Sequence, residues 1–283
     1  MEGLVTPDRY HCHATLSEKM AKQLADMPAL SVIQFSDVKP DEKTLHHLNE
    51  LVFKDRKDIT LRVYGYGDSW KDIGFLARLP ELERFDWDSD QFLSFDPLYK
   101  LKKLVSLGMG FGCPKPKISV AFLADFKETL TAINMLGDYK DFIETIPKLV
   151  NLSTIWLSSM KLKDFGFLAG LPIETLANYG GRVNSFDFVN QLKTIRHIWI
   201  KTNATLADFD FISELPLLET IEMYYVSKLI RFPKCDHLPN LTKVVASDCN
   251  RLCDISEVRK LKNCNISLYG KKVPGKFYRV PWP

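Results

Sequence analysis

The sequence predicts a right-handed α/β solenoid, in which short parallel strands stack side by side and short return segments connect them. Two observations predict this fold: an internal repeat of about 22 residues, and apolar residues at fixed places within each repeat. A unit of this length cannot bury its own apolar side chains, so several units must stack to form one continuous core. The 283 residues provide about nine such units together with end caps.

The strand of each repeat has the pattern LxxLxL, where L stands for an apolar residue. Copies that begin at residues 130, 152, 173, 195, 218 and 241 follow one another after 22, 21, 22, 23 and 23 residues. Alternate side chains of a strand point to the same side, so the apolar residues of each copy face one core. The side chains between them are therefore expected on the opposite, solvent-facing side of the sheet.

A second phrase precedes the strands and predicts the return segments. Its clearest copies are residues 72–80, 164–172 and 208–216, which all begin with Asp, carry Phe at the fourth place and end with Leu-Pro. These segments are only about ten residues long and rich in Phe, Gly and Pro, which leaves no room for long helices. We expect short 3-10 turns or irregular segments on the convex side.

The two phrases together resemble the leucine-rich repeat, in particular the roughly 22-residue class found in internalins and in certain phosphatase regulators. The resemblance covers about residues 59–268 and implies a horseshoe with a curved parallel sheet on its concave face. In this family a turn Asn after each strand satisfies backbone groups. The corresponding positions here hold the suitable residues Asn203, Asp90, Asp138 and Cys249, and the unsuitable residues Met160, Gly181 and Val226. An irregular solenoid is therefore expected.

The ends of the chain differ from the repeats. Residues 1–58 are expected to form an N-terminal α/β cap or a divergent first repeat, with amphipathic helices at 17–27 and 41–53 around a strand at 30–35. Residues 59–270 hold the repeats, and residues 271–283 form a C-terminal tail that covers the last one. Three Gly and two Pro predict an inserted loop at 108–117, and the strand register before it stays open.

The solvent-facing strand residues are the candidates for binding a partner. Trp156, Tyr179, Trp199 and Tyr224 come from four consecutive strands and predict a ridge of rings about 15 Å long. Trp and Tyr are enriched at binding hot spots, and an uncovered row of rings is costly in water. The alternative is a local register slip that buries some rings, for example Tyr179 in place of Asn178. The other predicted partner-binding residues are a mixed-charge rim of His197, Lys201, Glu222 and Lys243, and in an earlier strand Arg84, Asp86 and Asp88.

Motifs for metals, cofactors and catalysis are incomplete. The sequence 11–13, His-Cys-His, and the pair Cys249 and Cys253 each resemble part of a zinc site, but they lie more than 200 residues apart. The alternating acids of 86–90 lack the Gly and Glu of a calcium loop. Cys113 is the one cysteine expected to be exposed, and no base is placed beside it. Nucleotide-binding and hydrolase motifs do not occur. We therefore expect no metal, no cofactor and no catalysis.

Composition limits the class of partner. The net charge of +3 comes from 38 basic and 35 acidic residues without a basic stripe, which argues against a nucleic-acid partner. No secretory signal or membrane-length apolar run occurs, and the irregularly spaced cysteines are typical of reduced cytoplasmic thiols. We expect a cytoplasmic monomer that binds a protein, and no small-molecule substrate, on its concave face.

Three roles are compatible with this expectation. The first is a stoichiometric inhibitor or immunity-type protein, or equally a regulatory subunit, and the sequence does not separate these two. The second is an adhesive or structural protein of a cell surface, which would need an export signal and an anchor. The third is an enzyme that acts through the loop 108–117.

Overall fold

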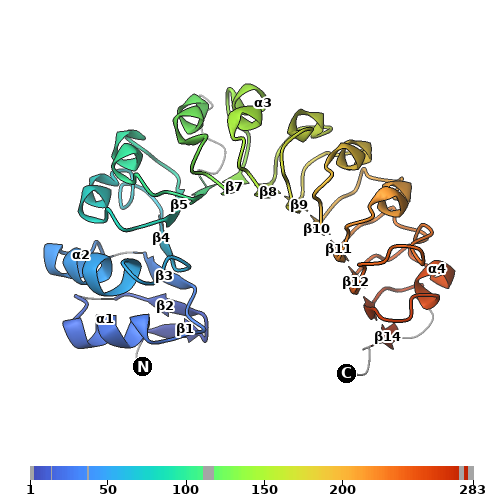
Figure 1. The fold of residues 1–283 in the computed structure, drawn as a ribbon, viewed down its shortest axis with the longest axis horizontal. Helices are drawn as coiled ribbons and strands as arrows, with labels where there is room; N and C mark the ends of the chain where they lie inside the picture. Colours follow the sequence, from blue (N-terminus) through green and yellow to red (C-terminus); the bar gives the residue numbers. More distant parts are fainter. Residues whose placement is uncertain (1–2, 14, 37, 111–117, 274–276, 280–283) are drawn as a thin grey trace. The chain divides into compact units, whose positions relative to one another are not determined.

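The computed structural model describes residues 3–13, 15–36, 38–110, 118–273 and 277–279, the last three by their backbone alone. The chain forms two compact units, Met1–Leu136 and Gly137–Pro283. In each unit, short strands alternate with return segments that carry short helical turns (Figure 1). The concave face of a unit is defined as the side of its sheet that faces away from the return segments.

The first unit contains a sheet in which each strand pairs with the next one in the chain. Strands β1 and β2 are antiparallel, whereas β2 to β7 are parallel. The strands are β1 (Leu4–Thr6), β2 (Arg9–His11), β3 (Val32–Phe35), β4 (Thr60–Gly65), β5 (Arg84–Ser89), β6 (Ser106–Gly110) and β7 (Ala132–Leu136). The return segments hold α1 (Glu18–Ala25), α2 (Glu42–Leu48), the π-helical turn η1 (Asn49–Phe53) and the 3-10 turns η2 (Gly74–Arg78), η3 (Asp96–Lys100) and η4 (Ala121–Phe126).

The second unit has the same organisation. Strands β8 to β13 pair in parallel, except that the pair β13–β14 is antiparallel. The strands are β8 (Thr154–Ser158), β9 (Thr175–Tyr179), β10 (His197–Lys201), β11 (Thr220–Tyr224), β12 (Lys243–Ser247), β13 (Asn265–Leu268) and β14 (Phe277–Arg279). The return segments hold α3 (Phe142–Thr145), α4 (Ser256–Arg259) and the 3-10 turns η5 (Ile146–Lys148), η6 (Gly166–Leu168), η7 (Asp187–Gln191) and η8 (Asp210–Glu214).

The two N-terminal helices form where the sequence places them. The Ser17 side chain accepts a hydrogen bond from the backbone of the first turn of α1, and Asp41 does the same for α2. At the other end of α1, the Arg56 guanidinium donates hydrogen bonds to the carbonyls of Ala25 and Met27, so it caps the helix and ties it to the next repeat. The expected helical N-terminal cap is therefore confirmed.

Alternation along the strands builds the core. In β5, Phe85 and Trp87 are fully buried, while Arg84, Asp86 and Asp88, which alternate with them, are partly exposed. In β8, Ile155 and Leu157 are fully buried in the same way. The return segments add a Phe at almost every repeat, so each unit encloses a continuous apolar layer. The predicted solenoid of parallel strands and short 3-10 turns is confirmed.

The predicted loop at 108–117 is wrong in its first part. Residues Ser106–Gly110 form strand β6, in register with both β5 and β7. Leu107 and Met109 continue the core pattern, and the glycines occupy the alternate positions on the concave face. Glycine lowers strand propensity but does not break a strand whose other residues are buried and paired on both sides. Residues 111–117, including Cys113, lie outside the described part of the chain.

The turns after strands β8 to β12 of the second unit each have a left-handed residue. These residues are Ser159, Gly180, Thr202, Tyr225 and Asp248, with φ between 54° and 70°. The amide of each of the first four donates to the carbonyl at the end of the following strand. One residue beyond, the buried Asn203 side chain bonds the Val183 carbonyl and the amides of 205 and 206, the role that the resemblance implies.

Candidate functional site

The parallel register of the second unit sorts the side chains of its concave face into three rows. The middle row contains both tryptophans, and the third row contains both tyrosines. The first row is Thr154, Thr175, His197, Thr220, Lys243 and Asn265; the middle row is Trp156, Ala177, Trp199, Glu222, Val245 and Ser267; the third row is Ser158, Tyr179, Lys201, Tyr224 and Ser247. The sequence predicted a single ridge of four rings. The structure instead places Trp156 and Trp199 in the middle row and Tyr179 and Tyr224 in the third row.

The two tryptophans of the middle row touch across an intervening strand. Trp156 and Trp199 are two strands apart, roughly 10 Å at normal strand spacing, yet their ring centroids are 5.0 Å apart with an interplanar angle of 63°. The residue between them is Ala177, which is fully buried. Its small side chain leaves the room into which both indoles lean, in an edge-to-face arrangement that aromatic pairs favour.

Tyr179 and Lys201 extend this contact into the third row. The Tyr179 ring lies 5.8 Å from Trp156 between centroids, and the Lys201 ammonium lies 5.7 Å from the centre of the Tyr179 ring. Burial and the negative charge of Glu222 raise the pKa of Tyr179, so the phenol stays neutral. Lys201 is exposed, whereas Trp156, Tyr179 and Trp199 are each partly exposed. The three rings and the ammonium group therefore hold one another in place through direct contacts.

Glu222 lies beside Trp199 in the middle row. It was expected in a charged rim, but only 7% of it is exposed. Its carboxylate accepts hydrogen bonds from Tyr224 Oη and Lys243 Nζ, both at 2.6 Å, and from the Trp199 side chain. Burial by itself would raise the pKa of Glu222, but these three hydrogen bonds outweigh it and keep the pKa below its usual value. A single ionised carboxylate thus fixes the orientation of one indole and one phenol.

Burial and the hydrogen bond to Glu222 raise the pKa of Tyr224.

The remaining rim residue, His197, contacts the Thr220 hydroxyl through Nδ1 at 3.0 Å and has Glu219 at 3.9 Å from Nε2. We use the name aromatic cluster for Trp156, Tyr179, Trp199 and Tyr224.

The three acidic and basic candidates of β5 belong to the first unit. Arg84 donates to the Lys57 carbonyl at 3.1 Å, and Asp88 accepts from Arg62 through Nε at 2.8 Å and through Nη2 at 2.6 Å. The Arg62 guanidinium also lies 4.6 Å from the centre of the Tyr64 ring. These residues belong to the first unit, whereas all four rings of Trp156, Tyr179, Trp199 and Tyr224 belong to the second.

Asp86 has a different environment from Asp88. It makes no hydrogen bond or ion pair with any residue of the described chain. Burial and the nearby charge of Asp88 raise the pKa of Asp86 to about 6, although Arg62 and Arg9 act in the opposite direction. The sequence does not reveal this difference, because both acids occupy equivalent concave-face positions of the same strand.

A solved structure shares this arrangement of strands and turns. An internalin (inlF) of Listeria monocytogenes superposes with a TM-score of 0.55 at 16% identity, over 87% of this chain and 69% of that one. The chain has the leucine-rich-repeat fold. A leucine-rich-repeat protein of Leptospira interrogans matches at 14% identity over 90% of this chain and 74% of that one, with a TM-score of 0.49. A second Listeria monocytogenes internalin (inlC2) matches at 18% identity over 75% of this chain and 78% of that one, with a TM-score of 0.35. No protein-family model and no curated protein matches the sequence.

The described residues contain no group of three or more His, Cys, Asp or Glu side chains that could hold a metal ion. In that same part of the chain, the helices are too short or too polar to cross a membrane. In the His-Cys-His sequence of residues 11–13, Cys12 is buried, which raises its pKa to about 12, and His11 bonds the Ser36 hydroxyl at 3.0 Å.

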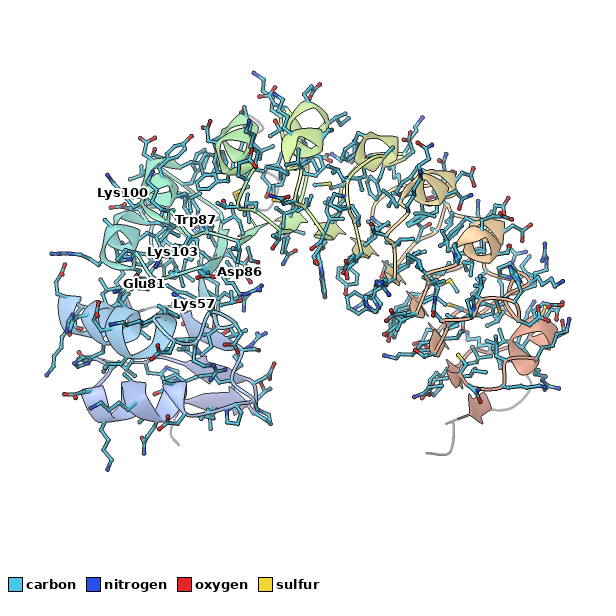
Figure 2. All side chains as sticks on the ribbon, in the orientation of Figure 1. Lys57, Glu81, Asp86, Trp87, Lys100 and Lys103 are labelled. Atoms are coloured by element: carbon cyan, nitrogen blue, oxygen red, sulfur yellow. The ribbon has the colours of Figure 1, made fainter. Side chains whose placement is uncertain are left out.

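One charged group of the first unit was not expected. The Glu81 carboxylate accepts hydrogen bonds from Lys57 at 2.9 Å and from Lys103 at 2.7 Å, so it links three successive repeats of the first unit (Figure 2). The hydrogen bonds from Lys103 and Lys57 lower the pKa of Glu81 to about 2. The repeat spacing itself carries the missing signal, because 57, 81 and 103 precede consecutive strands by similar distances.

Proposed function

We propose that this chain is a non-enzymatic interaction module that binds a partner protein through the aromatic cluster on the concave face of its second unit. One observation carries the proposal: Trp156, Trp199 and Tyr179 remain partly exposed although they are packed against one another and fixed by neighbouring side chains. By contrast, the tryptophans Trp70 and Trp87 of the first unit are fully buried.

The physical chemistry of the cluster supports this role. Large aromatic side chains dominate binding energy when a partner covers them, and truncating one can cost about 2 kcal/mol or more. Rings that are already held in position lose little conformational entropy on binding. The Glu222 contacts provide this order for Trp199 and Tyr224, and the contact over Ala177 provides it for Trp156.

The experiment is an affinity capture from native extract with matched variants. The double variant Trp156→Ala with Trp199→Ala removes both indoles, and Tyr66→Ala with Leu93→Ala removes two side chains that are 90% and 64% exposed outside the cluster. A prominent partner should disappear with the first double variant and remain with the second. Circular dichroism and urea unfolding establish that both variants are folded. If the folded tryptophan variant keeps every partner, the proposal is wrong.

The role of the complex follows from the captured partner. We propose a cytoplasmic monomer that acts as a stoichiometric inhibitor or immunity-type protein, or as a regulatory subunit. Titration of this chain into an assay of the partner's activity separates them. An inhibitor abolishes activity at one equivalent, whereas a regulatory subunit changes its rate or specificity without abolishing it.

A further inference from the structure

Strand β6 presents two glycines on the concave face of the first unit, and both are buried. Gly108 and Gly110 occupy the middle and last of its three concave-face positions, in register with Asp86 and Asp88 of β5 on one side. A Cβ atom added at Gly108 would collide with the Asp86 carboxylate, and one at Gly110 would collide with that of Asp88. Both carboxylates therefore lean over the glycine strand, and only glycine leaves room for them there.

The two carboxylates differ in how their charge is balanced. Asp88 accepts two short hydrogen bonds from Arg62, which also donates to Gln34 Oε1 at 3.3 Å. Asp86 is partly buried and has neither a hydrogen bond nor an ion pair within the described chain. A carboxylate taken out of water without a donor is energetically unfavourable, and the Asp88 charge adds repulsion. Among the described residues no Lys or Arg forms an ion pair with Asp86, although Arg62 and Arg9 act on its charge from a greater distance.

We propose that the Asp86 carboxylate, which lies over Gly108, forms a binding site for the guanidinium group of an arginine side chain presented by a protein partner. A guanidinium is flat, and two of its N–H groups can donate to one carboxylate in a bidentate pair. On the far side of the glycine strand, Asn134 is exposed in register with Gly108 and offers a further acceptor.

The raised pKa of Asp86 is consistent with this site. Desolvation and Asp88 raise the pKa to about 6, whereas Arg62 and Arg9 are the positive charges that lower it. A bound guanidinium would stabilise the ionised form and so lower the pKa. The site depends on first-unit residues only, so it and the aromatic cluster of the proposed function stand or fall separately.

The test is a titration by nuclear magnetic resonance with aspartate labelled at the carboxyl carbon, using Nα-acetyl-arginine amide as the probe. In the free protein the Asp86 signal should titrate near pH 6, and saturating probe should move this midpoint downward. Asp86→Asn should raise the probe Kd at least about tenfold, which corresponds to the loss of ~1.4 kcal/mol. Asp90→Asn, the same change at an exposed residue, should leave the Kd unaltered.

A second variant tests the glycine strand without removing the charge. Gly108→Ala should also weaken the probe, because the carboxylate must move away from the strand. The proposal is overturned if Asp86 titrates near the ordinary value of about 4, or if Asp86→Asn and Asp90→Asn bind the probe equally. Equal or tighter binding of Nα-acetyl-lysine amide, or of the uncharged citrulline analogue, would also overturn it.

Discussion

The concave faces of the two units use the same device with different chemistry. In the first unit, glycines at 108 and 110 let carboxylates lean over their strand. In the second unit, Ala177 lets Trp156 and Trp199 lean over theirs. The register of a repeat sets which positions neighbour each other, and one small residue then decides whether large neighbours meet above it. The concave face of the first unit is therefore polar, and its Asp86 carboxylate has no ion pair within the described chain. The concave face of the second unit is aromatic, and its Glu222 carboxylate is paired with Lys243.

The largest expected effect is the difference in stability loss between removing a core tryptophan and removing a tryptophan of the concave face. Trp87 of the first unit is fully buried and its indole donates to the Trp70 carbonyl at 2.7 Å, so Trp87→Ala should lower the free energy of unfolding by about 3–5 kcal/mol. Trp156→Ala removes a partly exposed ring of the second unit and should cost less than about 2 kcal/mol. Urea unfolding at neutral pH measures both. Equal losses would mean that Trp156 is a core residue.

Filling the space at Ala177 should break the contact between the indoles. Ala177→Leu adds volume to a fully buried position, and overpacking of this kind costs about 1–3 kcal/mol. The near-ultraviolet circular dichroism of the tryptophans should change together with the stability. Ala132→Leu is the control, since Ala132 is partly exposed on the concave face of the first unit. An unchanged spectrum for Ala177→Leu would contradict the assigned role of the small residue.

Two carboxylates of the first unit should respond to pH with opposite sign. The folded pKa of Glu81, about 2, is below its ordinary 4.5, so its contribution to stability is present above pH 4.5 and is lost as pH falls toward 2. The folded pKa of Asp86, about 6, is above its ordinary 3.8, so ionisation destabilises the fold increasingly as pH rises from 3.8 through 6.

Replacing each carboxylate by its uncharged amide measures this difference in pH dependence. At pH 7, Glu81→Gln should be less stable than the wild type, and Asp86→Asn should be more stable. Near pH 3.5 the Asp86→Asn advantage should vanish, because the wild-type aspartate is then protonated in the native state and largely so after unfolding. Urea unfolding between pH 3.5 and 7.5 checks both. A loss of stability at pH 7 on changing Asp86 to Asn would refute its unbalanced charge.

The smallest effects concern the left-handed turns of the second unit. Tyr225 has φ 54° and a ring that is 54% exposed, so Tyr225→Gly should relieve backbone strain and stabilise the fold by ~0.5–1 kcal/mol. Gly180 occupies the equivalent turn with φ 70°, and Gly180→Ala should destabilise by ~1 kcal/mol. Thermal unfolding compares the two. Changes of the same sign would show that the turns are not equivalent.

The sequence predicted those features that depend on periodicity. Regular 21- to 23-residue steps fix the stacking of the strands, and alternation places Trp156 and Trp199 on the concave face. The helix caps at Ser17 and Asp41 were readable because capping is local. Strand β6 was missed because its glycines resemble a loop until the neighbouring strands are known to pair with it.

Features that depend on neighbours in adjacent repeats were not predicted. Glu222 is buried because Trp199 is beside it in register and because Lys243 and Tyr224 reach its carboxylate. The unequal environments of Asp86 and Asp88 arise from a single arginine two dozen residues away, Arg62. Such pairings require the register of three strands at once, which a single repeat does not contain.

Site-specific photocrosslinking tests the central claim, that the aromatic cluster of the second unit is a partner-binding surface. A photoreactive phenylalanine analogue at position 179 reports on the cluster, and the same analogue at Phe167, partly exposed on a return segment of that unit, is the control. In native extract, position 179 should give a discrete protein adduct that is lost when Trp156 and Trp199 are changed to Ala, and position 167 should not give it. The same adduct from both positions, or an adduct at 179 that survives the loss of both tryptophans in a folded protein, would contradict the account.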